Sequence, residues 1–176
     1  MAESKLIILC GEAFAGKSTL AKQLAERLDL KIVGRDEIYF ATNHILALDH
    51  TPDEDDSALW KALWPIVVQG IKNHLMLGNS VVVDDNCIRR SERDDLRNIA
   101  SKVGAKSALV YMDISSEVLK ERKEKNKISK ERHDVPSAWM LEDSAEFERP
   151  TESENPIIYK EGMPINELVK SIEYYF

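Results

Sequence analysis

The chain has 176 residues, of which 43% are hydrophobic and 31% are charged, and this composition is typical of one globular domain with a buried core. No apolar run approaches the ~18 residues that a membrane span requires, so we expect no membrane association. The net charge of −7, from 24 basic and 31 acidic residues, argues against a large nonspecific surface for nucleic acid.

The first residues, 1–5, show no signal-peptide pattern and lead straight into a predicted strand over Leu6–Cys10, so we expect a cytoplasmic protein. The next eight residues, Gly11 to Ser18, follow the pattern G-x-x-x-x-G-K-S and precede a predicted helix over Thr19–Leu28. A buried strand that turns sharply into a helix points backbone N–H groups at one spot, which favours a phosphate anion there. A glycine turn before an ordinary helix is the alternative interpretation.

This loop predicts an ATP or GTP site. Lys17 would reach the β- and γ-phosphates, and the Ser18 hydroxyl would ligate Mg²⁺. No guanine-reading N-K-x-D segment occurs, but adenine has no comparable short signature, so the choice of nucleotide stays open. The predicted nucleotide-binding residues of the loop are Gly11, Ala13, Phe14, Ala15, Gly16, Lys17, Ser18 and Thr19.

The second predicted strand, Lys31–Val33, is followed by Gly34-Arg35-Asp36. In open α/β sheets the ligand lies beyond the carboxyl ends of the strands, so Asp36 would face the phosphate loop across the cleft. Transfer of a γ-phosphoryl group to an alcohol needs a group that orients the hydroxyl and takes its proton, and Asp36 is the candidate for this base. Alternatively, Asp36 caps a helix that begins at Glu37.

The third predicted strand ends in an acidic residue. A long helix is predicted over Asp53–Leu77 and the strand over Val81–Asp84. An apolar strand that ends in Asp holds Mg²⁺ directly or through water in P-loop proteins, so Asp84 is a second candidate metal ligand. A turn-forming aspartate is the alternative.

A basic segment follows the fourth predicted strand, Ser107–Met112. From Lys120 to Arg132 there are seven Lys or Arg against three Glu. This segment is either a solvated helix face with i,i+4 ion pairs or a lid, at about residues 120–136, that closes over the nucleotide. In a lid, one arginine would neutralise charge on the γ-phosphoryl group while another could stack on the base, and Arg122 and Arg132 are both candidates.

Strands alternate with helices along the whole chain. This order predicts an α/β, three-layer P-loop NTPase fold with a parallel five-stranded sheet and a small helical lid, in a single domain over residues 1–176. Cys10 and Cys87 each follow a predicted strand, and we expect them to pack at the same edge of the sheet. The remaining predicted elements are helices over Arg93–Val103, Glu117–Glu124, Pro136–Phe147 and Ile165–Tyr175 and a strand over Ile157–Tyr159.

Together these motifs resemble a known family, the P-loop kinases whose best-studied members are the polynucleotide 5′-hydroxyl kinases, within the AAA-type and zeta-toxin-like kinases. The resemblance extends from Lys5 to about Ile158. It rests on Gly11–Ser18, Arg35-Asp36, Asp84-Asp85-Asn86, Arg122 and Arg132, and Phe147-Glu148-Arg149-Pro150-Thr151 with Glu154.

The resemblance implies roles for several of these positions. Asp36 would be the general base, and Lys17 with a lid arginine, Arg132 or Arg122, would stabilise the migrating phosphoryl group. The acceptor would be held by residues that follow the second and third strands. The substrate-binding candidates are Arg35, Asp85 and Asn86.

Three positions depart from the family pattern. Tyr39 stands where polynucleotide kinases often have an arginine that grips a substrate phosphate. Asp85 replaces a threonine, and Asn126 stands where a lid arginine is expected, a loss for which Arg132 could compensate. Fewer basic residues near the acceptor weaken the case for a polyanionic substrate.

The sequence therefore predicts an ATP-dependent, Mg²⁺-requiring transfer of phosphate to a hydroxyl acceptor, with a nucleic-acid 5′-hydroxyl as the best specific guess. One alternative is a small-molecule kinase that acts on a nucleoside, sugar or antibiotic, which the acidic balance and Tyr39 favour. The other is a nucleotide-dependent switch or binding protein that hydrolyses the nucleotide slowly.

Overall fold

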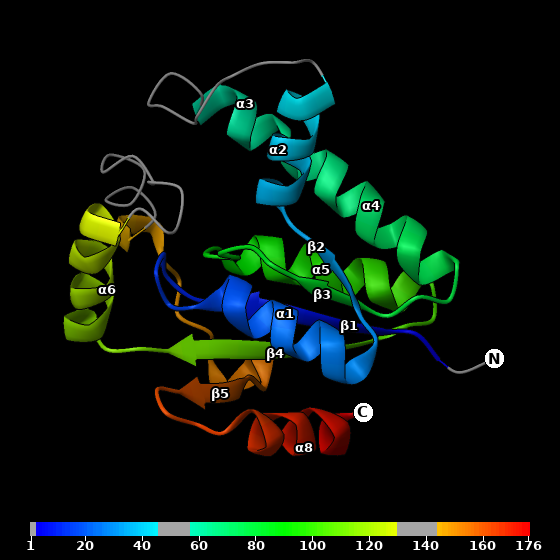
Figure 1. Ribbon diagram of the computed structural model, residues 1–176. Coiled ribbons are helices and arrows are strands. Elements are labelled where there is room, and N and C mark those ends of the chain that lie inside the picture. The colour runs from blue at the N-terminus through cyan, green and yellow to red at the C-terminus, as the bar shows by residue number, and fades with distance from the viewer. Residues whose placement is uncertain (1–2, 46–56, 130–143) are drawn as a thin grey trace.

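A computed structural model describes residues 3–45, 57–129 and 144–176 (Figure 1). One sheet of five parallel strands crosses the molecule in the order β2-β3-β1-β4-β5. This arrangement confirms the predicted α/β fold with a parallel five-stranded sheet. The strands are β1 (Lys5–Cys10), β2 (Lys31–Val33), β3 (Val81–Val83), β4 (Lys106–Asp113) and β5 (Ile157–Lys160).

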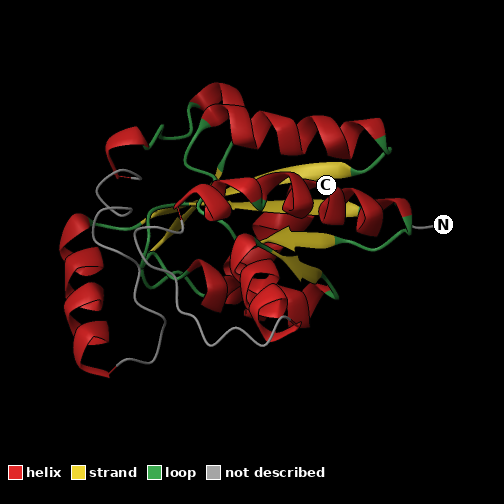
Figure 2. Ribbon diagram, turned by 90° about the horizontal axis from the view of Figure 1, so that it is seen from above, coloured by secondary structure: helices red, strands yellow, loops and turns green. Residues whose placement is uncertain are grey.

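Helices cover both faces of the sheet, which gives three layers (Figures 1 and 2). Strand β1 shows how they are divided, because its side chains alternate between the faces: Leu6 and Ile8 join one core cluster, whereas Ile7 and Leu9 join the other. Helices α4 (Trp64–Met76) and α5 (Arg90–Lys102) pack on the first face. Helices α1 (Lys17–Leu28) and α8 (Ile165–Tyr175) pack on the second.

The central strand brings the candidate site residues to one edge. Strand β1 lies between β3 and β4, with Ile8 level with Val83 and Leu109. All strands run in the same direction, so the segments that follow β1, β2 and β3 emerge together at the carboxyl edge. The three motifs expected to hold nucleotide, metal and acceptor therefore meet.

Helix α6 (Ser116–Ser129) stands beside the carboxyl edge and apart from the two helical layers (Figure 1). It carries a single buried residue, Asn126, so it packs on the body far less than the other long helices. This helix overlaps the predicted lid, of which residues 130–136 lie outside the described residues.

Two predicted helices differ in detail from the structure. The helix predicted over Asp53–Leu77 is two helices, α3 (Ser57–Ala62) and α4, with Leu63 between them and residues 53–56 outside the described residues. Pro65 explains the break, because proline favours the first turn of a new helix and cannot continue an old one. Of the helix predicted over residues 136–147, residues 136–143 are not described and Phe147 lies in a loop.

Helix α2 (Arg35–Ile45) begins earlier than the helix that the sequence suggested at Glu37. Asp36 is therefore in the first turn of this helix and not at a cap before it. Within the described ranges, no helix is both long and apolar enough to span a bilayer.

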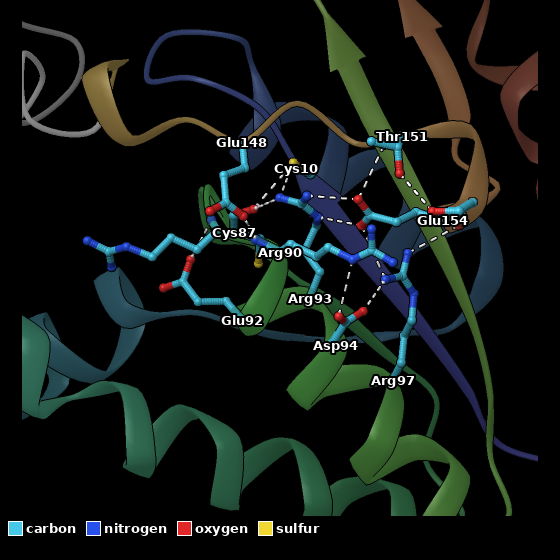
Figure 3. A network of polar contacts seen from close by, with 12 residues as sticks. Cys10, Cys87, Arg90, Glu92, Arg93, Asp94, Arg97, Glu148, Thr151 and Glu154 are labelled. Carbon is cyan, nitrogen blue, oxygen red and sulfur yellow. Dashed lines mark hydrogen bonds and ion pairs between the residues drawn. The ribbon is translucent and has the colours of Figure 1, made fainter.

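A buried ion pair joins α5 to the short 3₁₀ helix η2 (Glu152–Glu154). Arg93 has no exposed surface and Glu154 is 5% exposed. The Nε of Arg93 donates to Oε2 of Glu154 at 2.7 Å, and its Nη2 donates to Oε1 at 2.9 Å (Figure 3). Burial alone would raise the pKa of Glu154, but hydrogen bonds from Arg93 and from the Thr151 backbone outweigh it and lower the pKa to about 2.

This ion pair should make the stability of the fold depend on pH in the acid range. The carboxyl group of Glu154 titrates near 4.5 when it is unfolded and near 2 when it is folded. The stabilisation is complete above the higher value and is lost as the pH falls through the lower one, a loss of roughly 3 kcal/mol. Guanidinium unfolding of the wild type and of Glu154→Gln from about pH 6 to about pH 2 measures it.

The wild type should lose stability steeply over that range, whereas Glu154→Gln should begin less stable and change less. Glu173→Gln removes an exposed carboxylate of α8 and is the matched control, which should follow the wild type. Parallel profiles for the wild type and Glu154→Gln would contradict the assignment of this pH dependence to Glu154.

Gly34 sits where the chain leaves β2 and passes very close to the backbone after β3. A Cβ added to Gly34 would lie 2.1 Å from the carbonyl oxygen of Asp84 and 2.7 Å from Oε2 of Glu37. A backbone oxygen cannot move aside cheaply, so only glycine fits here. The close approach brings the start of α2 against the turn that contains Asp84.

Gly34→Ala should destabilise the fold by about 1–3 kcal/mol or more, since the new methyl group must push two backbone segments apart. Gly70→Ala is the matched control, because its Cβ would lie 3.8 Å from Val33 at ordinary contact distance and alanine favours a helix. Thermal unfolding of both variants checks the contrast: equal stability of the two would mean that the approach at Gly34 is not tight.

Candidate active site

The phosphate-loop motif connects β1 to α1 and has the backbone of an anion cradle. Gly16, directly before α1, has φ 97° and Phe14 has φ 66°, both in the left-handed region. The Ala15 N–H donates to the Glu12 carbonyl at 3.2 Å, which closes the turn. The loop therefore wraps around the N-terminus of α1, where the unpaired N–H groups of a helix favour a phosphate.

Lys17 lies inside this cradle. Its residue is 5% exposed, and its Nζ donates to the carbonyls of Gly11 at 2.9 Å and Glu12 at 2.7 Å. A buried ammonium group held at the loop supplies the positive charge that a polyphosphate needs. The neighbouring loop residues are more accessible than Lys17: Ala13 and Ser18 are half-buried and Thr19 is exposed.

A pocket of about 400 Å³ opens beside the loop, between α1, α6 and the segment after β5. Arg122 of α6 lines it and donates through Nη1 to the carbonyl of Ala15 at 2.9 Å and through Nη2 to Glu161 at 3.0 Å. This volume is within the range of small-molecule sites. The residues that line it are Phe14, Ala15, Gly16, Thr19, Leu20, Gln23, Met112, Arg122, Lys125, Asn126, Ser129, Tyr159, Glu161 and Gly162.

Several carboxylates gather on the other side of the loop. Asp36 is in the first turn of α2, and Asp84 follows β3. Partial burial raises the pKa of Glu37 to about 7, and the neighbouring charges of Asp84 and Asp36 push it in the same direction. These acidic groups therefore lie close enough for their charges to interact.

Arg35 is held by its own neighbours. Its Nε donates to Asp85 at 2.9 Å, its Nη2 donates to Glu92 at 3.0 Å, and its guanidinium group lies 4.9 Å from the centre of the Trp64 ring. Two carboxylates already balance this cation. The predicted acceptor-binding residues Arg35 and Asp85 therefore contact each other.

Asn86 belongs to the turn that supports the loop. Its carbonyl accepts a hydrogen bond from the Gly11 N–H at 3.1 Å, and its own N–H donates to Oδ1 of Asp85 at 2.8 Å. The turn after β3 is thereby tied directly to the first residue of the phosphate loop.

Tyr39, which replaces the expected phosphate-gripping arginine, is buried. It is 1% exposed and packs against Phe40 and Trp60 at ring distances of 5.4 Å. Arg132, the predicted catalytic arginine, lies outside the described residues, so its role stays a prediction.

No three His, Cys, Asp or Glu side chains among residues 3–45, 57–129 and 144–176 are grouped to hold a metal ion by themselves. A Mg²⁺ site of the P-loop kind needs only one or two protein ligands, which act with water and the phosphates. Ser18, in the first turn of α1, and Asp84, at the end of β3, fit that donor set.

Sequence reasoning missed three charged residues at this edge. Glu37 and Glu92 join the acidic side, and Arg93 pairs with Glu154, which the sequence marked only as part of the family resemblance. Only the strand order could have indicated the first two, because it brings the starts of α2 and α5 to the turn after β3.

Residues 6–150 match the protein family described as AAA domain. The chain is also similar to L-seryl-tRNA(Sec) kinase of Methanococcus maripaludis, with 30% identity over 155 residues that cover 78% of this chain and 57% of the relative. The chain thus spans less than two thirds of that relative's length.

Two solved structures share the fold over almost the full chain. A protein of Chloroflexus aurantiacus to which a kinase activity has been ascribed has a TM-score of 0.78 at 20% identity, covering 99% of each chain. Kti12 of Chaetomium thermophilum, solved with ADP-AlF3, has a TM-score of 0.74 at 15% identity, covering 96% of this chain and 97% of the other. At such identities the likeness concerns the fold alone.

Proposed function

The chain belongs to the AAA domain family, and on that basis we propose that it is an ATP-dependent phosphotransferase whose acceptor is a hydroxyl of a neutral or positively charged small molecule. The observation that carries this proposal is the meeting of two groups at the carboxyl edge. The phosphate loop with the buried Lys17 lies on one side, and the carboxylates around Asp36 lie on the other.

The donor side suits a nucleoside triphosphate. The loop N–H groups and Lys17 bind the β- and γ-phosphates, and the pocket beside Arg122 receives the base. Ser18 and Asp84 would hold Mg²⁺, which would supply positive charge beside the phosphates. Arg132 remains the candidate for a lid arginine that stabilises charge on the transferred group.

The acceptor side supplies a base. Asp36 accepts a hydrogen bond from the acceptor hydroxyl and takes its proton while the acceptor oxygen forms a bond to the γ-phosphorus. The bond between that phosphorus and the bridging oxygen breaks, and ADP leaves with the electron pair. Lys17 stabilises the charge that builds on the leaving oxygens.

The charge of the acceptor side favours a small molecule over a nucleic acid. Asp36 and Asp84 are acidic, Glu37 with a pKa of about 7 carries part of a negative charge at neutral pH, and the cation of Arg35 is already paired. Tyr39 is buried and offers no grip for a substrate phosphate. A polyanionic 5′ end would meet repulsion from the described part of this surface, whereas a neutral or cationic alcohol would not.

Asp36→Asn should lower phosphate transfer by about 10²-fold or more, because asparagine cannot take the proton. Affinity for ATP should change little, since Asp36 is on the acceptor side. The measurement is transfer of labelled γ-phosphate with Mg²⁺, alongside calorimetric binding of ATP. The acceptor panel contains sugars, nucleosides, amino alcohols, serine esters and a short 5′-hydroxyl oligonucleotide.

Asp95→Asn is the matched control, because it removes an exposed carboxylate of α5 away from the site. Label that appears only as free phosphate, at an equal rate in wild type and Asp36→Asn, would refute transfer and favour a nucleotide-dependent switch. The relative from Methanococcus maripaludis is named for L-seryl-tRNA(Sec), so an aminoacylated tRNA belongs in the panel as well.

The salt dependence of the Michaelis constant distinguishes a small-molecule acceptor from a nucleic acid. The Michaelis constant for a small neutral acceptor should stay nearly constant between about 50 and about 200 mM salt, whereas that for an oligonucleotide should rise steeply as counterion release weakens binding. Measurement of this constant for every acceptor that takes up label tests the preference. Efficient labelling of the oligonucleotide alone, with steep salt dependence, would restore the polynucleotide kinase hypothesis.

A further inference from the structure

Arg93 and Glu154 form a buried pair beside Cys10 and Cys87, between the end of β1 and the turn after β3 (Figure 3). We propose that they are a positioning pair, which sets the phosphate loop relative to the turn after β3 and so controls the rate of phosphate transfer. The kinetic part of this inference rests on the proposed function. The structural part concerns the backbone at Gly11 and can be tested without any turnover.

Arg93 holds the turn after β3 through its third nitrogen. Nη1 donates to the carbonyl of Cys87 at 2.9 Å and to that of Ile88 at 3.2 Å. The same nitrogen lies 3.8 Å from the Sγ of Cys10, the last residue of β1. One guanidinium group thus contacts both the end of β1 and the turn after β3.

The turn needs such support because its backbone is strained. Cys87 has φ 45°, a left-handed conformation that costs a residue with a Cβ free energy. Such a conformation persists only where the surroundings hold it. The hydrogen bond from Arg93 to the Cys87 carbonyl is one restraint, and the bond from the Cys10 Sγ–H to the same carbonyl at 3.4 Å is another.

The turn after β3 is joined to the phosphate loop by one backbone hydrogen bond. The carbonyl of Asn86, directly before Cys87, accepts the hydrogen bond from the Gly11 N–H. A rotation of the peptide at Cys87 would therefore move the acceptor of that bond and release Gly11. It would also move Asp85 and Asp84, which precede Asn86 in the same turn.

Glu154, for its part, holds the side chain of Arg93 in place. The carboxylate binds two guanidinium nitrogens of Arg93 and also accepts from Nη1 of Arg97 at 3.2 Å. A lysine has no fork and could not bind Glu154 at two points while also reaching the Cys87 carbonyl. Arg97 shares Glu154 but has no hydrogen bond among those described to Cys10, Cys87 or Ile88, which makes it a natural control.

The test replaces the pair by apolar residues, because removal of one partner would leave a buried charge whose destabilisation would mask any effect on the turn. Arg93→Met with Glu154→Met keeps the volume and loses the hydrogen bonds to the turn. Arg97→Gln keeps those bonds and loses only the contacts that Arg97 makes with Asp94 and Glu154. Each variant is examined by thermal unfolding, by amide hydrogen exchange at Gly11, and by kcat and KM for ATP.

For the double variant we expect faster exchange at Gly11, kcat lower by on the order of 10- to 100-fold, and KM for ATP changed much less. Arg97→Gln should match the wild type in exchange at Gly11 and in kcat. Unchanged exchange at Gly11 in the folded double variant would overturn the inference, and so would unchanged kcat in a protein that transfers phosphate. Should the double variant not fold, Arg93→Lys is read by the same criteria.

The two proposals fail in different ways. Absence of phosphate transfer by the wild type would refute the proposed function, and exchange at Gly11 would then decide the positioning role by itself. Transfer by the wild type with unaltered kcat in the double variant would refute the positioning role alone.

Discussion

Arg93 carries a full positive charge into the interior, and much of the carboxyl edge of the sheet is organised around it. A buried guanidinium group is tolerated only when its donors are paired, and here Glu154 and the carbonyls after β3 pair them. A hydrophobic pair of similar volume could pack as well, so stability is a weak reason for its presence. Its geometric effect is more specific, because it contacts the end of β1, the turn after β3 and the segment before β5.

The carboxyl edge of the sheet has cationic side chains on one side and acidic side chains on the other. On the side of α1 and α6, Lys17 and Arg122 point cations at the phosphate loop and its pocket. On the side of α2, most of the charged side chains are carboxylates near Asp36, and the charge of Arg35 is balanced by its ion pairs. Under the proposed function, this arrangement would separate the polyanionic nucleotide from a neutral or cationic acceptor. Transfer between the two would depend on holding them at a fixed distance, which is the role proposed for the turn after β3.

The strands, the phosphate loop and the two candidate aspartates were predictable because each rests on a local signal. Apolar runs mark the strands, and the loop has fixed glycines at a fixed spacing. The division of α3 from α4 at Pro65 was missed because apolar periodicity continues across it. The pairing of Arg35 with Asp85 and Glu92 could not be predicted, since the residues are 50 and 57 positions apart and only the strand order joins them.

By itself, the sequence determined which chemistry this chain carries: a phosphate-binding loop, an acid after each of two neighbouring strands, and an alternation of strands and helices that makes the sheet parallel. The tertiary structure alone decided which charged and polar side chains can meet a ligand. It paired Arg35, buried Tyr39 and joined Arg93 to Glu154. The physical reason is that a motif specifies side chains and local backbone, whereas the charge a ligand meets depends on partners that folding brings from distant parts of the chain.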